Sequence, residues 1–168
     1  MKKLVLAFAL LIVGTSILKA QDLESAKAKF IYNFTSFFEW PQSERTGDFI
    51  IGVMGSPDVY SSLKSYTEGK KVIVQNIKVK KISNLNDVSD CHVLFVSKFK
   101  INKLDDLKQE LSSNTLFISD SEKGIESGAA INFVLNGNRL RYEFAASNAM
   151  SNGLKFSSRV RDMASKNY

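Results

Sequence analysis

Apolar and aromatic residues recur at helical spacing near the start of the chain, between residues 22 and 41. Six of the thirteen residues from 29 to 41 are aromatic, and Pro41 closes the segment. Seven apolar residues form one broad stripe on a helical wheel: Leu23, Ala26, Phe30, Ile31, Phe34, Phe37 and Phe38. We predict an amphipathic helix that buries this stripe and ends at the proline, which cannot continue a helix.

Four residues of the same segment fall outside the apolar stripe. Tyr32 and Glu39 lie seven residues apart on the opposite side, and Asn33 and Trp40 share one flank. Two interpretations stay open at this point. The segment is either a core helix with no further role, or a helix whose other side contacts a partner or a ligand.

The rest of the chain alternates short apolar runs with amphipathic stretches. The pattern predicts strands at residues 49–54, 72–74, 77–82, 92–97, 115–119, 130–135 and 139–144, and helices at residues 57–66, 104–111, 145–152 and 158–166. Residues 77–82 alternate apolar and basic side chains, as a half-exposed strand near a sheet edge does. Asn136-Gly137 is the strongest hairpin signal in the chain. We predict an α/β fold, a single-domain sandwich of a mixed central β-sheet with helices on both faces.

The first twenty residues have the pattern of a signal peptide. A positive start, Lys2-Lys3, precedes an apolar run at residues 4–13, and Ala20 offers a small residue before the predicted cleavage point at Gln21. An uncleaved membrane anchor is the alternative, although the run is short for a transmembrane helix. We therefore expect an exported, periplasmic protein whose domain covers residues 21–168, with no stable membrane insertion after cleavage.

Net charge gives little support to nucleic-acid binding. Removing residues 1–20 takes away three lysines and no acids, so the formal charge falls from +6 to +3. Half of the net positive charge therefore belongs to the predicted signal peptide, which weakens the argument for nucleic-acid binding. We expect no nucleic-acid partner.

Cys91 is the single cysteine, so an intrachain disulfide is excluded and packing must hold the exported fold together. Its place at the start of the run 91–96 predicts a buried cysteine that behaves as a small apolar residue. A disulfide between two chains is the alternative.

The residue pattern offers little for catalysis. His92 is the single histidine and falls in a run that reads as a buried strand, and the chain has no Gly-x-Ser-x-Gly motif. One histidine and one cysteine make a zinc site improbable. We predict no catalytic residues, no metal and no cofactor, and therefore no enzyme.

Two features could instead contact a ligand or a partner. The turn at Gly55 and Ser56, between a predicted strand and a predicted helix, is either a tight connection or a crevice that receives an anion. Arg141 and Glu143 project to one face of a predicted strand. They either pair with each other or present a polar patch.

Several collinear segments resemble the YfiR-like family of exported proteins. They are residues 27–34 (KAKFIYNF), 38–41 (FEWP), 91–97 (CHVLFVS), 131–134 (INFV), 141–144 (RYEF) and 153–160 (GLKFSSRV). Two departures stand out. Ala145 replaces the asparagine that usually follows the hairpin, and only Cys91 is present where family members often carry paired cysteines.

The resemblance implies a non-enzymatic periplasmic regulator. Such a protein binds the periplasmic region of an inner-membrane diguanylate cyclase and holds the cyclase inactive; related domains precede histidine kinases. On this basis Tyr32, Trp40, Arg141 and Glu143 are the candidate partner contacts, and a homodimer stays open. The alternative is a periplasmic small-molecule-binding module that uses the crevice at Gly55 and Ser56.

Overall fold

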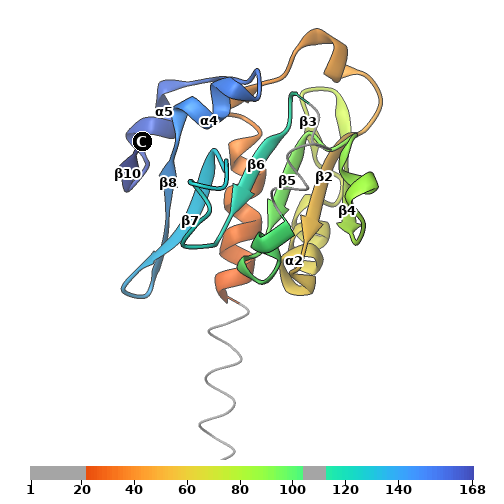
Figure 1. Cartoon of the computed structure of the whole chain (residues 1–168). Coiled ribbons are helices and arrows are strands. Elements are labelled where there is room, and N and C mark those ends of the chain that lie inside the picture. The colour runs from red at the N-terminus through yellow and green to blue at the C-terminus, as the bar shows by residue number, and fades with distance from the viewer. Residues whose placement is uncertain (1–21, 104–112) are drawn as a thin grey trace, which may run out of the picture.

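A computed structural model of the chain describes residues 22–103 and 113–168 (Figure 1). The predicted signal peptide and the predicted helix at residues 104–111 lie outside the described residues. The remainder forms one α/β domain with a mixed, curled sheet, as the sequence predicts.

Eight strands form the main sheet in the order β10-β8-β7-β6-β5-β2-β4-β3. Their bounds are β2 (Phe49–Met54), β3 (Lys71–Val72), β4 (Gln75–Ile82), β5 (Val93–Val96), β6 (Leu116–Ser119), β7 (Ile131–Asn136), β8 (Arg139–Phe144) and β10 (Lys166–Asn167). The five strands from β4 to β7 run parallel, β8 and β3 pair antiparallel with their neighbours, and β10 runs parallel to β8. A separate ribbon joins β1 (Phe38–Glu39) to β9 (Lys155–Phe156).

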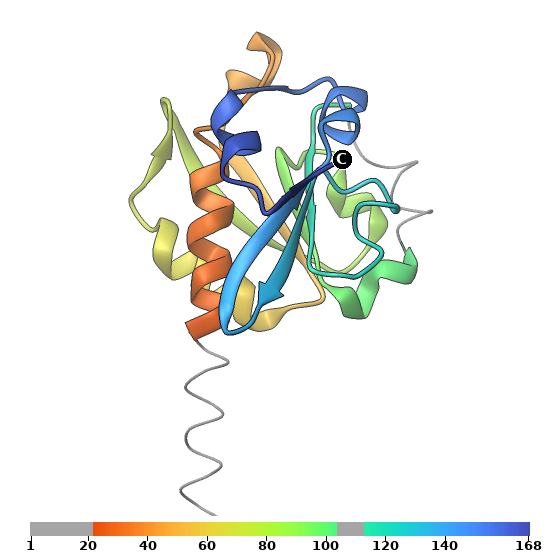
Figure 2. The same ribbon diagram turned by 90° about the vertical axis from the view of Figure 1, so that its left-hand side faces the viewer.

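The helices cover the sheet unevenly. The N-terminal helix (residues 22–34) and α2 (Pro57–Thr67) lie on the same side of the sheet, as the turned view shows (Figure 2). The other side carries the 3₁₀ segments η2 (Leu85–Val88) and η3 (Lys98–Lys103). The remaining helical segments are η1 (Gln42–Arg45), α4 (Ala146–Ser151) and α5 (Ser158–Asp162).

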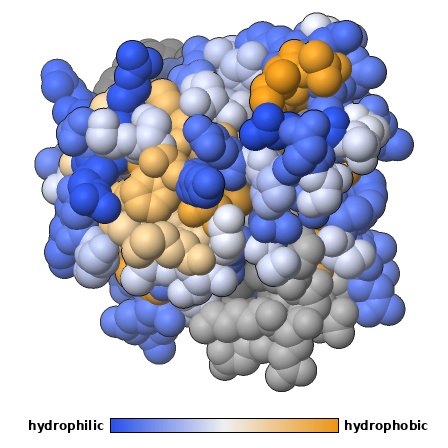
Figure 3. All heavy atoms as spheres, turned by 90° about the horizontal axis from the view of Figure 1, so that it is seen from above, coloured by the Kyte–Doolittle hydropathy of each residue, from blue (hydrophilic) through white to orange (hydrophobic). Residues whose placement is uncertain are grey.

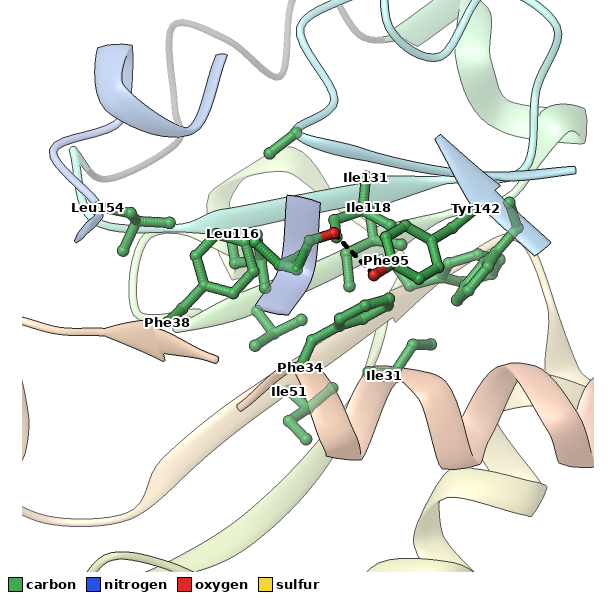
Figure 4. Packing of buried hydrophobic residues seen from close by; sticks show 14 of the residues in the cluster. Ile31, Phe34, Phe38, Ile51, Phe95, Leu116, Ile118, Ile131, Tyr142 and Leu154 are labelled. Atoms are coloured by element: carbon green, nitrogen blue, oxygen red, sulfur yellow. Dashed lines mark hydrogen bonds between the residues drawn. The ribbon is translucent and has the colours of Figure 1, made fainter. Parts of the chain in front are cut away.

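Two apolar clusters fill the two faces of the sheet. The central strands β2, β5 and β6 are buried along their whole length, because a sheet that is covered on both sides has no solvent face. In β2, Ile51 belongs to the cluster beneath the N-terminal helix and Ile50 to the opposite cluster, as the two-residue period of a strand requires. Phe34 and Tyr142 point toward one another in the larger cluster, with ring centroids 4.9 Å apart (Figure 4).

The N-terminal helix ends at residue 34, so the prediction of a helix up to Pro41 is wrong. The hydroxyls of Thr35 and Ser36 donate to the carbonyl oxygens of Tyr32 and Asn33, at 2.7 Å each. Such bonds let serine and threonine compete with the helical ladder. The chain then turns, and residues 38–39 become β1, which pairs with a segment more than a hundred residues further on.

The predicted extended segment at residues 72–74 is confirmed only at Val72, which ends β3, and is wrong for Ile73 and Val74. Ile73 and Val74 form the two-residue connection between β3 and β4, and Ile73 has a φ of 56°. A β-branched residue rarely adopts this left-handed conformation. The two side chains are 73% and 71% exposed. Figure 3 shows that strongly hydrophobic side chains do reach the surface on the face of the molecule seen from above.

The predicted hairpin is confirmed as β7 and β8, joined by Gly137 and Asn138. Gly137 has a φ of 59° and Asn138 does not share a positive φ, which is the pattern of a turn with glycine at its first central position. The last predicted helix is shorter than expected: α5 ends at Asp162, and the chain continues as β10 along β8.

Candidate functional site

The predicted crevice lies at the carboxyl ends of the parallel strands. β4 and β5 lie on opposite sides of β2, so the strand order reverses at β2, the position where α/β sheets commonly bind ligands. Gly55 follows β2 with a φ of 82°, and the Ser56 hydroxyl accepts a hydrogen bond from the Val59 amide at 3.3 Å, capping α2. A cavity of about 360 Å³ opens beside these two residues.

The lining of this cavity favours an anion. Lys81 and Lys100 border it together with Ser83, and the first turn of α2 adds the positive end of a helix dipole. A Cβ at Gly55 would lie 2.6 Å from Cγ of Lys100, so the close approach of that lysine requires glycine. Among the described residues that line the cavity, no hydrogen bond joins a nucleophile to a base; the Ser56 hydroxyl caps α2 instead.

Tyr32 contacts its own chain through an aromatic cluster. Its ring lies edge-on to Tyr66 of α2, with centroids 5.7 Å apart. The Lys70 ammonium sits 3.3 Å from the Tyr66 centroid and 4.7 Å from that of Tyr32. The half-buried Tyr32 therefore joins the N-terminal helix to α2 and leaves only part of its ring to solvent.

Trp40 does not lie on an accessible flank, and its assignment as a partner contact is corrected. Its side chain is 6% exposed and meets Phe49 edge-on at 4.9 Å. The indole N–H donates to the carbonyl of His92 at 3.3 Å. The helix ends at residue 34, so Trp40 is not part of it. The helical spacing that put Trp40 on one flank with Asn33 therefore does not apply.

His92 has a structural role next to Trp40. Its Nδ1 accepts a hydrogen bond from the Ile50 amide at 3.1 Å, so Nε2 carries the proton and donates to the Glu44 carbonyl at 2.9 Å. The ring also stacks on Phe49 at 4.5 Å. The imidazole thus joins η1 to the sheet, with both nitrogens in use.

Arg141 and Glu143 do lie on one face of β8, as predicted. Arg141 is exposed and Glu143 is half-buried. Within residues 22–103 and 113–168 no ion pair joins them. Glu143 instead accepts from Asn132 and from the Tyr168 hydroxyl, at 3.4 Å each. Of the two alternatives, the structure therefore favours the polar patch.

A buried ion cluster escaped the sequence prediction. The Lys27 ammonium, 6% exposed as a residue, donates to Glu24 at 2.9 Å and to Asp120 at 2.7 Å. Burial alone would lower the pKa of this ammonium, but the hydrogen bonds to Asp120 and Glu24 outweigh burial and hold the pKa above its ordinary value. Asp120 also accepts from the Lys98 amide at 2.7 Å. The one sequence feature that could have indicated this cluster is the position of Lys27 within the apolar stripe of the helix.

Cys91 is buried, as predicted. Burial, with a smaller contribution from the charge of Asp90, raises the pKa of its thiol to about 12. The sulfur packs so closely that a Cβ at Gly52 would lie 2.7 Å away. The thiol is therefore protonated and shielded, and no group of metal-binding side chains is found in the described part of the chain.

Comparison with known proteins decides the family. A family model described as YfiR/HmsC-like matches residues 24–165. The chain belongs to the YfiR/HmsC-like family. This family is regulatory rather than catalytic, and it is known for the periplasmic regulation of diguanylate cyclases. Family members are typically periplasmic, and no helix among the described residues is long and apolar enough to span a membrane.

The other comparisons add little to the family assignment. No curated protein sequence matches the chain. A solved structure described under "Substrate-directed dual catalysis of dicarbonyl compounds by diketoreductase" aligns at 11% identity over 64% of this chain and 62% of that one. The TM-score of 0.36 is too low to support an argument about fold or activity.

Proposed function

We propose that this protein is an exported, non-enzymatic regulator that binds the periplasmic region of an inner-membrane signalling protein and represses it. The favoured target is a diguanylate cyclase, and a histidine kinase is the other target class. The family match over residues 24–165 carries the proposal. A sheet whose one histidine and one cysteine are both committed to packing is consistent with work done by binding.

The exposed polar face of β8 is the proposed contact surface. Arg141 is exposed there, and the carboxylate of Glu143 is oriented by Asn132 and Tyr168. Arginine is enriched among residues that dominate interface energies. Arg141→Ala should therefore weaken binding of the partner's periplasmic region, whereas the buried Trp40 should act only through stability.

The experiment combines a deletion strain with direct binding. Deleting the gene should raise cyclic di-GMP, and the purified domain should bind the periplasmic region of a cyclase encoded beside it, measured by calorimetry. The Lys123→Ala variant, changed at an exposed position outside β8, is the charge control. Unchanged cyclic di-GMP together with no binding to any neighbouring sensor would refute the proposal.

Export is tested separately, because the signal peptide is a prediction from sequence. Intact mass of the protein from the periplasmic fraction should correspond to a chain that starts at Gln21. Recovery of the full-length chain in the membrane fraction would contradict it.

A second candidate function rests on the cavity at Gly55 and Ser56. Its volume of about 360 Å³ and its two lysines suit a small anionic ligand. Inorganic phosphate and a panel of carboxylates should then raise the melting temperature of the wild type more than that of Lys100→Ala. Equal shifts in both proteins would exclude this cavity as the site.

A further inference from the structure

β4 leaves most of one edge without a neighbour among the described residues. On its inner side it pairs with β2 along Ile77–Ile82. On its outer side β3 pairs only with Gln75 and Asn76. Six residues of this strand therefore have no described strand on their outer side, and in Figure 1 β4 lies near the margin of the sheet.

The hairpin between β3 and β4 fixes which backbone groups face outward. Val72 and Gln75 close a two-residue turn, so they exchange both of their backbone hydrogen bonds. The backbone N–H and C=O of Gln75 therefore face the outer edge. Because this direction alternates along a strand, the same groups of Ile77, Val79 and Lys81 face outward too. No backbone hydrogen bond from a turn or loop of the described residues reaches the N–H or C=O groups of Ile77, Val79 or Lys81.

The surface beside this edge is hollow. A depression of about 810 Å³ runs between α2 and β4 and is bordered by Lys64, Ile77 and Lys78. A second, of about 680 Å³, continues past Lys81 toward η2. Tyr60 and Val79 border both, and both are half-buried side chains that pack on the core. An added strand would thus find apolar contacts as well as backbone partners.

The charged side chains along the edge carry a positive excess. Lys80 is paired with Asp90 at 2.5 Å, and the Asp87 carboxylate caps the Asn84 amide. Four lysines therefore border the two hollows against three acids, an excess of one positive charge: Lys64, Lys78, Lys80 and Lys81 against Glu68, Asp87 and Asp90. Lysines on a free edge discourage pairing with a second copy of the same basic edge. The lysines leave the outer edge of β4 open to a strand that carries carboxylates.

We propose that the outer edge of β4 is a strand-addition site, which binds an extended acidic segment of the regulated partner protein. Main-chain hydrogen bonds to Ile77, Val79 and Lys81 would supply affinity, and the lysines would supply selectivity. The inference rests on the proposed regulatory function and adds to the polar face of β8 a second partner contact, near the opposite margin of the sheet.

A matched pair of variants separates backbone pairing from charge. Lys81→Ala removes a charge and keeps the outward N–H, whereas Lys81→Pro removes both. Proline is tolerated where the N–H of an edge strand faces away from its neighbour. We expect Lys81→Pro to bind the partner's periplasmic region at least tenfold more weakly than Lys81→Ala in calorimetry. Equal affinities of the two folded variants would overturn the proposal.

Hydrogen exchange tests the wild-type protein without any substitution. Binding of the partner's periplasmic region should slow the exchange of the Ile77, Val79 and Lys81 amides at least tenfold. Binding that leaves these three amides unchanged would overturn the proposal while the regulatory function stands. Slowing that depends on the concentration of this protein alone would assign the edge to a second copy, and would also overturn it.

A peptide probe keeps the test independent of the regulatory function. A labelled octapeptide of alternating glutamate and valine should bind and slow the three amides, and the lysine–valine counterpart should not. If no sensor binds but the acidic peptide does, the regulatory proposal fails and the edge site stands. If neither peptide binds and no amide slows, the edge site fails.

Discussion

The two edges of the sheet are finished in different ways. At one edge the last residues of the chain cover β8: β10 pairs with Glu143 and Phe144, and the Ser165 amide donates to the Tyr142 carbonyl at 2.8 Å. The covered edge is thus the second half of β8, residues 142–144. At the other edge β3 pairs with two residues of β4 and leaves residues 77–82 without a described strand on their outer side. The covered half of β8 is satisfied by its own chain, whereas a lysine-bearing open edge is protected from self-pairing and stays accessible to another chain.

The N-terminal helix supports both halves of the sheet, but with unequal contacts. Phe34 is buried against Tyr142 beneath the covered edge, while Tyr32 packs on Tyr66 and Lys70 at the side of α2. We expect Phe34→Ala to lower the free energy of unfolding by roughly 3–5 kcal/mol. Tyr32→Ala should lower it by about 1 kcal/mol. Urea titrations that give equal losses would contradict this division.

Proline substitutions test the direction of the backbone in the open edge. Lys78 directs its N–H toward β2, so Lys78→Pro should cost about 3 kcal/mol. Lys81 directs its N–H outward, so Lys81→Pro should stay within about 1 kcal/mol of the wild type. Lys78 and Lys81 are the same residue type and both side chains are exposed, so the two proline variants form a matched pair. Chemical denaturation with the reverse order would show that the outward groups have been assigned to the wrong residues.

The covered edge depends on the hydroxyl of Tyr142, which donates to the Val160 carbonyl of α5 at 2.7 Å. Tyr142→Phe should lower stability by about 1 kcal/mol near neutral pH. Burial, followed by the charge of Asp162, raises the pKa of Tyr142 from 10.0 to about 12. The stability that this group contributes is therefore complete below pH 10 and is lost as the pH rises toward 12.

The dependence of stability on pH above 10 gives a second measurement on the Tyr142→Phe variant. Between pH 10 and 12 the wild type should lose stability more steeply than Tyr142→Phe, which has no group to ionise there. Parallel pH profiles for the two proteins would show that the phenol is not protected in the folded state.

The smallest effect is expected from reductant. Cys91 is the only cysteine and is buried, so the melting temperature of the monomer should be the same with and without a reducing agent. A drop of several degrees at constant oligomeric state would mean that the thiol takes part in a stabilising bond.

Several parts of the fold followed from local pattern. The alternation of residues 77–82 indicated a half-exposed strand near a sheet edge, and β4 lies next to β3, the last strand of the order. Continuous apolar runs indicated the buried strands β2 and β5, and Asn136-Gly137 indicated the β7–β8 hairpin. In each case the residues that decide the structure are neighbours in sequence, so their pattern was enough.

The misplaced elements depended on partners that are distant in sequence. The sequence near Phe38 carries no signal that this residue pairs with Phe156 in a strand. The helix was therefore predicted too long, and Trp40 was placed on it by mistake. Ile73 and Val74 carry no turn signal, yet they form a turn because β3 pairs back on β4. Arg141 lies on the predicted strand, and Gly55–Ser56 forms the predicted turn between a strand and a helix. The ion cluster of Lys27 could not be predicted in the same way, because Asp120, one of its two partners, is 93 residues away.

The tight contact between Cys91 and Gly52 has a practical consequence for kinetics. A protonated thiol with no space around its sulfur reacts with an alkylating agent only after the strands around it separate. The chain has no second cysteine to contribute background. The rate of alkylation at saturating reagent therefore reports the rate at which the structure around Cys91 opens, and it can be read from a single mass shift without any introduced cysteine.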